Sequence, residues 1–86
     1  MKRESKGLRS IGIVQHIVDN KLITRGNRMK AEQIVNSIVT TNDKRKIGRV
    51  YDVFGPVNRP YVSVKAFKSV KEKQLRRFTN KEIFVL

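Results

Sequence analysis

The sequence IGRVYDVFGPVNRPYVSVK, residues 47–65, joins two strand-like runs through an unusually apolar connector, which we define as residues 54–61. A Gly-Pro pair and an Arg-Pro pair within the connector indicate a sharp reversal, because glycine tolerates positive φ and proline fixes φ while lacking a backbone donor. Phe54 and Val57 flank that reversal. Large apolar side chains beside a turn either fold back onto a core or form an exposed patch, and an exposed patch usually marks a partner surface.

The runs on either side of the connector, and most of the remaining chain, alternate with a period of two, which is typical of β-strands. In residues 61–67 the small apolar side chains alternate with Ser63 and Lys65, so we expect an antiparallel strand with Ser63 and Lys65 on a solvated face. Strict alternation in residues 11–19 places apolar groups on both faces, which indicates a strand covered at least in part on both sides. The strands we expect are residues 11–19, 21–25, 37–41, 46–54, 61–67 and 83–86.

Two segments fit more than one structure. Apolar side chains in residues 29–39 recur at spacings of one, three and four, which suits a helical stripe as well as short strands. The strand-rich surroundings favour a strand over residues 37–41, which leaves residues 26–36 as a long connection with room for one helical turn. Residues 69–81 are dominated by Lys and Arg and fit either a loop or a short helix.

Six short strands without a long helix predict an all-β fold, a small six-stranded antiparallel β-barrel, because a sheet of this size must curl to hide its edges. The chain has 86 residues, of which 38% are hydrophobic, so it can build one core. We expect a basic amino-terminal arm over residues 1–10. A single barrel domain then covers residues 11–86, with a basic loop at about residues 68–81.

The charge balance points to an acidic partner or an acidic assembly. Lys plus Arg number 20 against 7 Asp plus Glu, which gives a formal net charge of +13. Such an excess on a small domain draws it toward a nucleic-acid backbone and opposes self-association through repulsion. The alternative is a highly soluble surface without a specific partner.

Catalytic and metal-binding chemistry finds little support in the composition. There is no cysteine, and the only histidine, His16, lies among β-branched residues, so we expect a strand residue rather than a ligand or a base. The seven carboxylates are scattered through arms and turns, whereas acid-base or nucleophilic catalysis needs convergent groups. We expect no enzyme activity, no metal and no cofactor.

No apolar run approaches the roughly 18 residues of a membrane span, and no signal peptide follows the amino terminus. We therefore expect a cytoplasmic protein without a membrane partner.

Residues 42–65, NDKRKIGRVYDVFGPVNRPYVSVK, resemble the core signature of the glycine/arginine-rich-protein component of H/ACA ribonucleoproteins, in its short archaeal form. That signature is a Gly-x-Val strand, an Asp/Glu-x-Phe-Gly-Pro-Val connector and a Pro-Tyr-Val-x-Val-Lys strand. The matching residues are Gly48, Val50, Asp52, Phe54, Gly55, Pro56, Val57, Pro60, Tyr61, Val62, Val64 and Lys65. The residues before this segment fit the family's opening hairpin more loosely.

The resemblance implies a six-stranded barrel without catalytic activity. Its partner would be the pseudouridine synthase subunit of the RNA-guided H/ACA complex, with guide or substrate RNA contacted only indirectly or weakly. By docking on that subunit, the barrel would aid substrate RNA loading and product release during rRNA modification and ribosome biogenesis.

The connector is the surface we expect to contact the synthase, since interface energy concentrates in a few buried apolar anchors. For Phe54 and Tyr61 the residue pattern leaves two interpretations open, an outward patch or a plug in one end of the barrel. For Val57 and Pro60, at the turn itself, we expect exposure. The predicted interface residues are Phe54, Gly55, Pro56, Val57, Pro60 and Tyr61.

Basic residues in the later turn and loop are candidates for phosphate contacts that orient RNA without reading sequence, and the alternative is a set of solvated charges. Because aromatic residues are not interleaved with these basic runs, we expect no aromatic platform for single-stranded RNA. The candidate residues are Lys44, Arg45, Lys46, Lys71, Lys73, Arg76 and Arg77.

One rival function comes from another class. A basic β-barrel of this length also suits a ribosomal or translation-associated protein that binds structured RNA directly. A DNA-binding swapped barrel is more distant, because it requires an obligate dimer. An exposed apolar docking surface also allows the isolated chain to form a homodimer.

Overall fold

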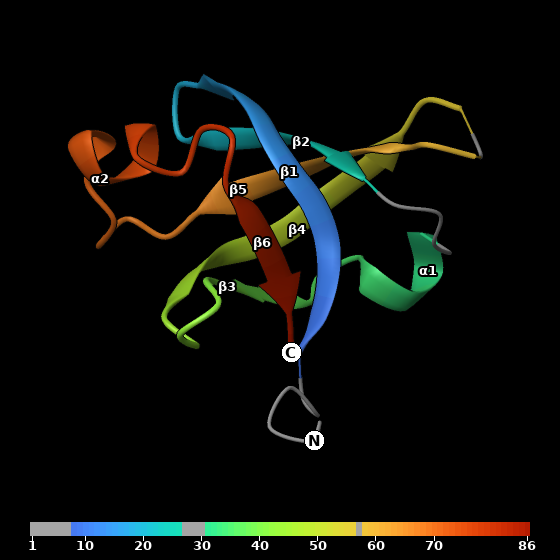
Figure 1. The fold of residues 1–86 in the computed structure, drawn as a ribbon, viewed down its shortest axis with the longest axis horizontal. Coiled ribbons are helices and arrows are strands. Elements are labelled where there is room, and N and C mark those ends of the chain that lie inside the picture. Colours follow the sequence, from blue (N-terminus) through green and yellow to red (C-terminus); the bar gives the residue numbers. More distant parts are fainter. Residues whose placement is uncertain (1–7, 27–30, 57) are drawn as a thin grey trace.

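The computed structural model describes residues 8–26, 31–56 and 58–86, which form a closed barrel of six antiparallel strands (Figure 1). The strands are β1 (Arg9–Val18), β2 (Lys21–Gly26), β3 (Ile38–Thr40), β4 (Lys46–Phe54), β5 (Tyr61–Ala66) and β6 (Glu82–Val85). Around the barrel they follow the order β1-β2-β5-β4-β3-β6. The all-β, six-stranded barrel predicted from the period-two pattern is confirmed.

Two short helices fill the segments that the sequence left ambiguous. Helix α1 (Ala31–Ile34) lies in the connection between β2 and β3, and helix α2 (Glu72–Arg76) lies in the basic segment between β5 and β6. Strand β1 begins at Arg9, so the last two residues of the expected amino-terminal arm belong to the barrel. Residues 1–7 of that arm lie outside the described part of the chain.

Strand β6 closes the barrel, because it is hydrogen-bonded to a strand on each side. Arg9 of β1 and Val39 of β3 both pair with Val85 of β6. Within β6, Ile83 and Val85 are buried, while Glu82 is exposed and Phe84 is partly exposed on the outer face. Pairing on both sides leaves this strand without a free edge, although it is only four residues long.

The barrel interior is filled mainly by aliphatic side chains from all six strands and both helices. Strands β4 and β5 approach closely at Gly48, where a Cβ atom would lie 2.5 Å from the backbone oxygen of Lys65. A glycine is therefore needed at this crossing. The buried apolar residues are Ile11, Val14, Leu22, Ile34, Val39, Ile47, Val50, Val62, Val64, Ala66, Leu75, Ile83 and Val85.

The predicted strict alternation of β1 is wrong. The pairing register shifts twice along this strand, between Ser10 and Gly12 opposite β6 and between Val14 and His16 opposite β2. Each irregularity adds a residue and changes which side chains face inward. As a result Val14 is buried, whereas His16 and Val18 are exposed, and His16 lies in a strand as expected.

The expected solvated position of Ser63 in β5 is also wrong, since only 6% of this residue is exposed. Ser63 pairs with Ile23 of β2 on one side and with Asp52 of β4 on the other. Its small side chain lies between larger neighbours on both adjacent strands, which reduces its contact with water. Lys65, two residues further, is exposed as predicted.

Helix α2 is fixed to the barrel by one apolar side chain. Leu75 is 2% exposed and belongs to the core, and Phe78 packs partly against the same core just after the helix. At the start of the helix, the Gln74 side-chain oxygen accepts a hydrogen bond from the Lys71 backbone N–H at 2.9 Å. These contacts determine where Arg77, immediately after α2, is held.

Substituting Leu75→Ala should lower the free energy of unfolding by about 2–5 kcal/mol, because it removes a fully buried side chain and leaves a cavity under α2. The exposed Lys73→Ala, in the same helix, should change it by no more than about 0.5 kcal/mol. Urea denaturation followed by circular dichroism measures both values. Equal stability of the two variants would show that α2 is not anchored through Leu75.

Candidate functional site

Strand β4 separates two parts of the surface. Its first residue, Lys46, follows the β3–β4 turn (residues 41–45), and its last, Phe54, begins the connector. From Lys46 to Phe54 the strand advances by eight residues, which corresponds to a length of roughly 26 Å. Figure 1 shows the connector between β4 and β5 at one end of the molecule, with α2 and the β3–β4 turn toward the other.

The connector presents an aromatic pair to solvent. Phe54 is 45% exposed, and its ring stacks on Tyr61 with centroids 5.7 Å apart and planes 21° apart. Phe54 ends β4 and Tyr61 begins β5, and the two residues are direct pairing partners, which brings their rings together. Gly55, with φ of 94°, and Pro56 follow and are both exposed. Of the two interpretations left open for Phe54, the structure shows the outward one.

Tyr61 is partly buried and held by Arg25 of β2. Arg25 Nη1 donates a hydrogen bond to the Tyr61 hydroxyl oxygen at 2.8 Å, and the guanidinium carbon lies 5.0 Å from the centre of the Tyr61 ring. This combination of a hydrogen bond and a cation–π contact restricts the ring. The exposed Phe54 ring therefore rests on a rigid base.

Pro60 differs from expectation, because it is buried rather than exposed. Its carbonyl oxygen accepts a hydrogen bond from the Gly26 backbone N–H at 2.7 Å, which holds the end of the connector against β2. The expected exposure of Val57 falls on a residue outside the described part of the chain.

The basic residues predicted for phosphate contact are all exposed, but they do not form one site. Arg76 pairs with Glu72 at 3.0 Å, which is the only ion pair within residues 8–26, 31–56 and 58–86. Arg45 and Arg77 come from the β3–β4 turn and the end of α2 and line one cavity. The others, exposed on the turn or on α2, are Lys44, Lys46, Lys71 and Lys73.

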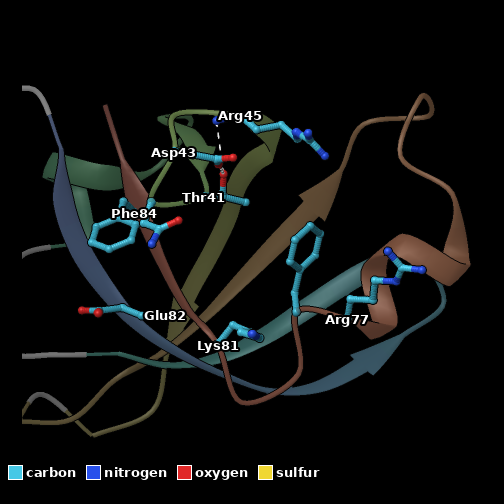
Figure 2. Close-up of a pocket in the computed structure, with 9 residues that line it drawn as sticks. Thr41, Asp43, Arg45, Arg77, Lys81, Glu82 and Phe84 are labelled. Atoms are coloured by element: carbon cyan, nitrogen blue, oxygen red, sulfur yellow. Dashed lines mark hydrogen bonds between the residues drawn. The ribbon is translucent and has the colours of Figure 1, made fainter.

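Two aromatic residues and one lysine that the sequence did not predict also line this cavity. Phe78, Lys81 and Phe84 line it together with Arg45 and Arg77, and its volume is about 400 Å³. We call it the basic pocket, and its other lining residues are Thr41, Asn42, Asp43 and Glu82. Figure 2 shows Arg45 from the turn, Arg77 from the end of α2 and Phe84 from β6 around the pocket. Two aromatic side chains, Phe78 and Phe84, therefore lie beside basic residues in space, which the separation of aromatic and basic residues expected from the sequence did not indicate.

A signal for Phe84 was present in the sequence. Residues 82–85 alternate as a strand, and burying Ile83 and Val85 places Phe84 on the outer face. For Phe78 and Lys81 no comparable signal exists, because their position depends on how α2 packs.

Two carboxylates also line the basic pocket, and each is engaged by a hydroxyl group. The hydrogen bond from the Thr41 hydroxyl lowers the pKa of Asp43, and the nearby positive charge of Arg45 acts in the same direction. Glu82 accepts a hydrogen bond from the Ser10 hydroxyl. Asp43 is therefore ionised at neutral pH and fixes the shape of the β3–β4 turn.

The described residues hold no group of three or more His, Cys, Asp or Glu side chains that would bind a metal ion. Within residues 8–26, 31–56 and 58–86, no helix is long and apolar enough to cross a membrane.

Removing the hydroxyl in Thr41→Val should raise the pKa of Asp43 toward its ordinary value of 3.8, whereas Thr41→Ser keeps the hydroxyl and should leave the pKa low. Because the pKa of Asp43 is lower in the folded than in the unfolded protein, ionised Asp43 stabilises the fold at pH values above its unfolded-state pKa. This stabilisation is lost as the pH falls through the folded-state pKa. NMR titration of the Asp43 carboxyl carbon measures the change. The same pKa in both variants would show that the Thr41 hydroxyl does not hold this carboxylate.

Comparison with known proteins places the whole barrel in one family. Residues 8–86 match the Gar1/Naf1 RNA binding region. The solved structure of the Gar1 domain of Naf1 is similar, with a TM-score of 0.72 and 25% identity over 91% of this chain and 84% of that chain.

Two curated proteins are also similar. An uncharacterized protein of Methanothermobacter thermautotrophicus is 27% identical over 91% of this chain and 83% of that protein. A probable H/ACA ribonucleoprotein complex subunit 1 of Dictyostelium discoideum is 28% identical over 87% of this chain, which spans only 32% of the Dictyostelium protein. The match over residues 8–86, together with the closed six-stranded barrel, shows that the chain belongs to the Gar1/Naf1 family.

Proposed function

We propose that this protein is a non-catalytic accessory subunit of an H/ACA RNA-guided pseudouridylation complex. In this proposal it docks on the pseudouridine synthase subunit and aids substrate RNA loading and product release during rRNA modification. Family membership and the similarity to a probable H/ACA complex subunit support the assignment to the complex. The observation that carries the docking role is the exposed Phe54 ring stacked on Tyr61 at the connector.

The connector has the physical properties of a docking centre. Interface energy concentrates in a few aromatic or apolar anchors that a partner desolvates, and Phe54 exposes such a surface next to Gly55 and Pro56. Anchors that are already ordered lose less conformational freedom on binding. Here Tyr61 is held by Arg25, and Pro60 is tied to β2 by its carbonyl oxygen, so the surface beneath Phe54 is ordered before docking.

The proposal assigns the chemistry to the synthase subunit. Acid-base and nucleophilic catalysis need convergent polar side chains in a cleft, whereas the described part of the connector presents an aromatic pair with glycine and proline. A partner that covers this surface at standard interface size would bury about 800 Å² of this protein. Such docking alters how the synthase handles RNA without adding a reactive group.

Substituting Phe54→Ala should weaken binding to the synthase subunit by roughly 30-fold or more in Kd, because it removes a central aromatic anchor worth about 2 kcal/mol. Tyr51→Ala is the matched control, since Tyr51 is an aromatic residue of the same strand and is 58% exposed. Calorimetric titration of the purified synthase subunit measures both affinities, and circular dichroism checks the fold.

Co-expression with the synthase subunit, nuclease treatment and size-exclusion chromatography separate docking from shared RNA binding. A single co-eluting peak that survives nuclease is the expected result. Loss of co-elution after nuclease would favour the rival, a protein that binds structured RNA directly. Equal affinity of Phe54→Ala and Tyr51→Ala would remove the connector from the interface.

A further inference from the structure

Phe84 is an aromatic side chain that the core does not require. It lies on the outer face of β6, and it is absent from the apolar residues that pack against the core, whereas Phe78 packs there in part. The one ring pair found in the described ranges joins Phe54 and Tyr61, so the Phe84 ring has no described aromatic partner. This ring instead lines the basic pocket, where a flat ligand would contact it.

The cationic side chains of the basic pocket are free to take an anion. Arg77 and Lys81 have no carboxylate within ion-pair distance among the residues that the structure describes, and Arg45 has only the exposed Asp43 nearby. Asp43 and Glu82 also line the pocket and keep their negative charge while accepting hydrogen bonds from the Thr41 and Ser10 hydroxyls, so the three cationic side chains outnumber two carboxylates. Positive groups gathered around one cavity attract a negative ligand, and the planar guanidinium fork suits phosphate oxygens.

The size of the basic pocket fits one nucleotide. Its volume of about 400 Å³ lies within the usual range of about 300–1,000 Å³ for small-ligand sites. A smaller hollow of about 110 Å³ shares Arg45, Arg77 and Phe78 with it. The other residues of this hollow, Ile47, Val70 and Gln74, are uncharged, so Arg45 and Arg77 supply its positive charge.

We propose that the basic pocket binds single-stranded RNA, with one base stacked on Phe84 and phosphates of the same strand on Lys81, Arg45 and Arg77. A ring that stacks and cations that hold phosphate are the two components of sequence-tolerant single-strand binding. A duplex keeps its bases stacked on one another and cannot offer one to Phe84. Inorganic phosphate would use the cations and leave the ring without a role.

This inference goes beyond the proposed docking function and stands apart from it. The pocket and the connector lie at opposite ends of β4, roughly 26 Å apart along the strand. A protein partner on the connector would leave the basic pocket open to RNA, so each proposal can fail without the other.

The test uses the full chain and a fluorescein-labelled, mixed-sequence RNA of about 12 nucleotides, single-stranded or annealed to its complement, in anisotropy titrations. Phe84→Leu keeps an apolar side chain but removes the stacking ring, and it should weaken single-strand binding about tenfold. Phe54→Leu, the control, removes the exposed ring at the connector and should leave the affinity unchanged.

Arg77→Ala and Arg76→Ala form the second matched pair. They are neighbours that change the net charge equally, but Arg77 lines the basic pocket and Arg76 pairs with Glu72 away from it. Loss of one phosphate contact should reduce the slope of log affinity against log salt concentration by about 0.7 in Arg77→Ala. The slope should not change in Arg76→Ala.

The proposal would be overturned if Phe84→Leu bound RNA as tightly as Phe54→Leu and Arg77→Ala had the same salt dependence as Arg76→Ala. It would also be overturned if the duplex bound as tightly as the single strand, because either result would show diffuse charge attraction only. If Phe84→Leu fails to fold by circular dichroism, the arginine pair decides, because both arginines are exposed. Phe84→Leu should still co-elute with the synthase subunit, and Phe54→Ala should still bind the RNA. These two results distinguish failure of this inference from failure of the docking proposal.

Discussion

Closure of the barrel by β6 is the constraint on which the rest of this structure depends. An open sheet of six short strands would expose two edges to pairing with other chains, and β6 removes both edges by bonding to β1 and β3 at once. The same pairing directs Ile83 and Val85 inward and leaves Phe84 outside. Closure therefore also brings an aromatic side chain of the last strand to the wall of the basic pocket.

Strand β4 keeps two kinds of surface apart on a small domain. It is long enough to place the connector and the basic pocket at different ends, so an apolar surface and a cationic one do not interfere. A protein partner is best held by ordered aromatic surface, while RNA is best held by charge with a stacking face. An adaptor that joins a protein to RNA requires both, and the barrel presents them without a second domain.

Most of the fold followed from residues that are close in sequence. The Gly-Pro punctuation and the period-two runs predicted the six strands, because strand pairing through short turns is a local property. Predictions failed where distant contacts decide. The two register shifts in β1 depend on its partner strands, Pro60 is buried by its bond to Gly26, and the pocket combines the β3–β4 turn with α2 and β6. The outward position of Phe54 was one of two interpretations, since a local pattern does not show which side of a turn faces the core.

The central claim is that the connector faces outward to bind the synthase subunit while the basic pocket remains accessible. Hydrogen exchange of this protein, alone and saturated with that subunit, tests it most directly, because it reports which backbone segments become covered. We predict slower exchange in residues 53–59 and unchanged exchange in residues 41–45 and 76–81. Slower exchange at the turn and after α2, with none at the connector, would contradict the account.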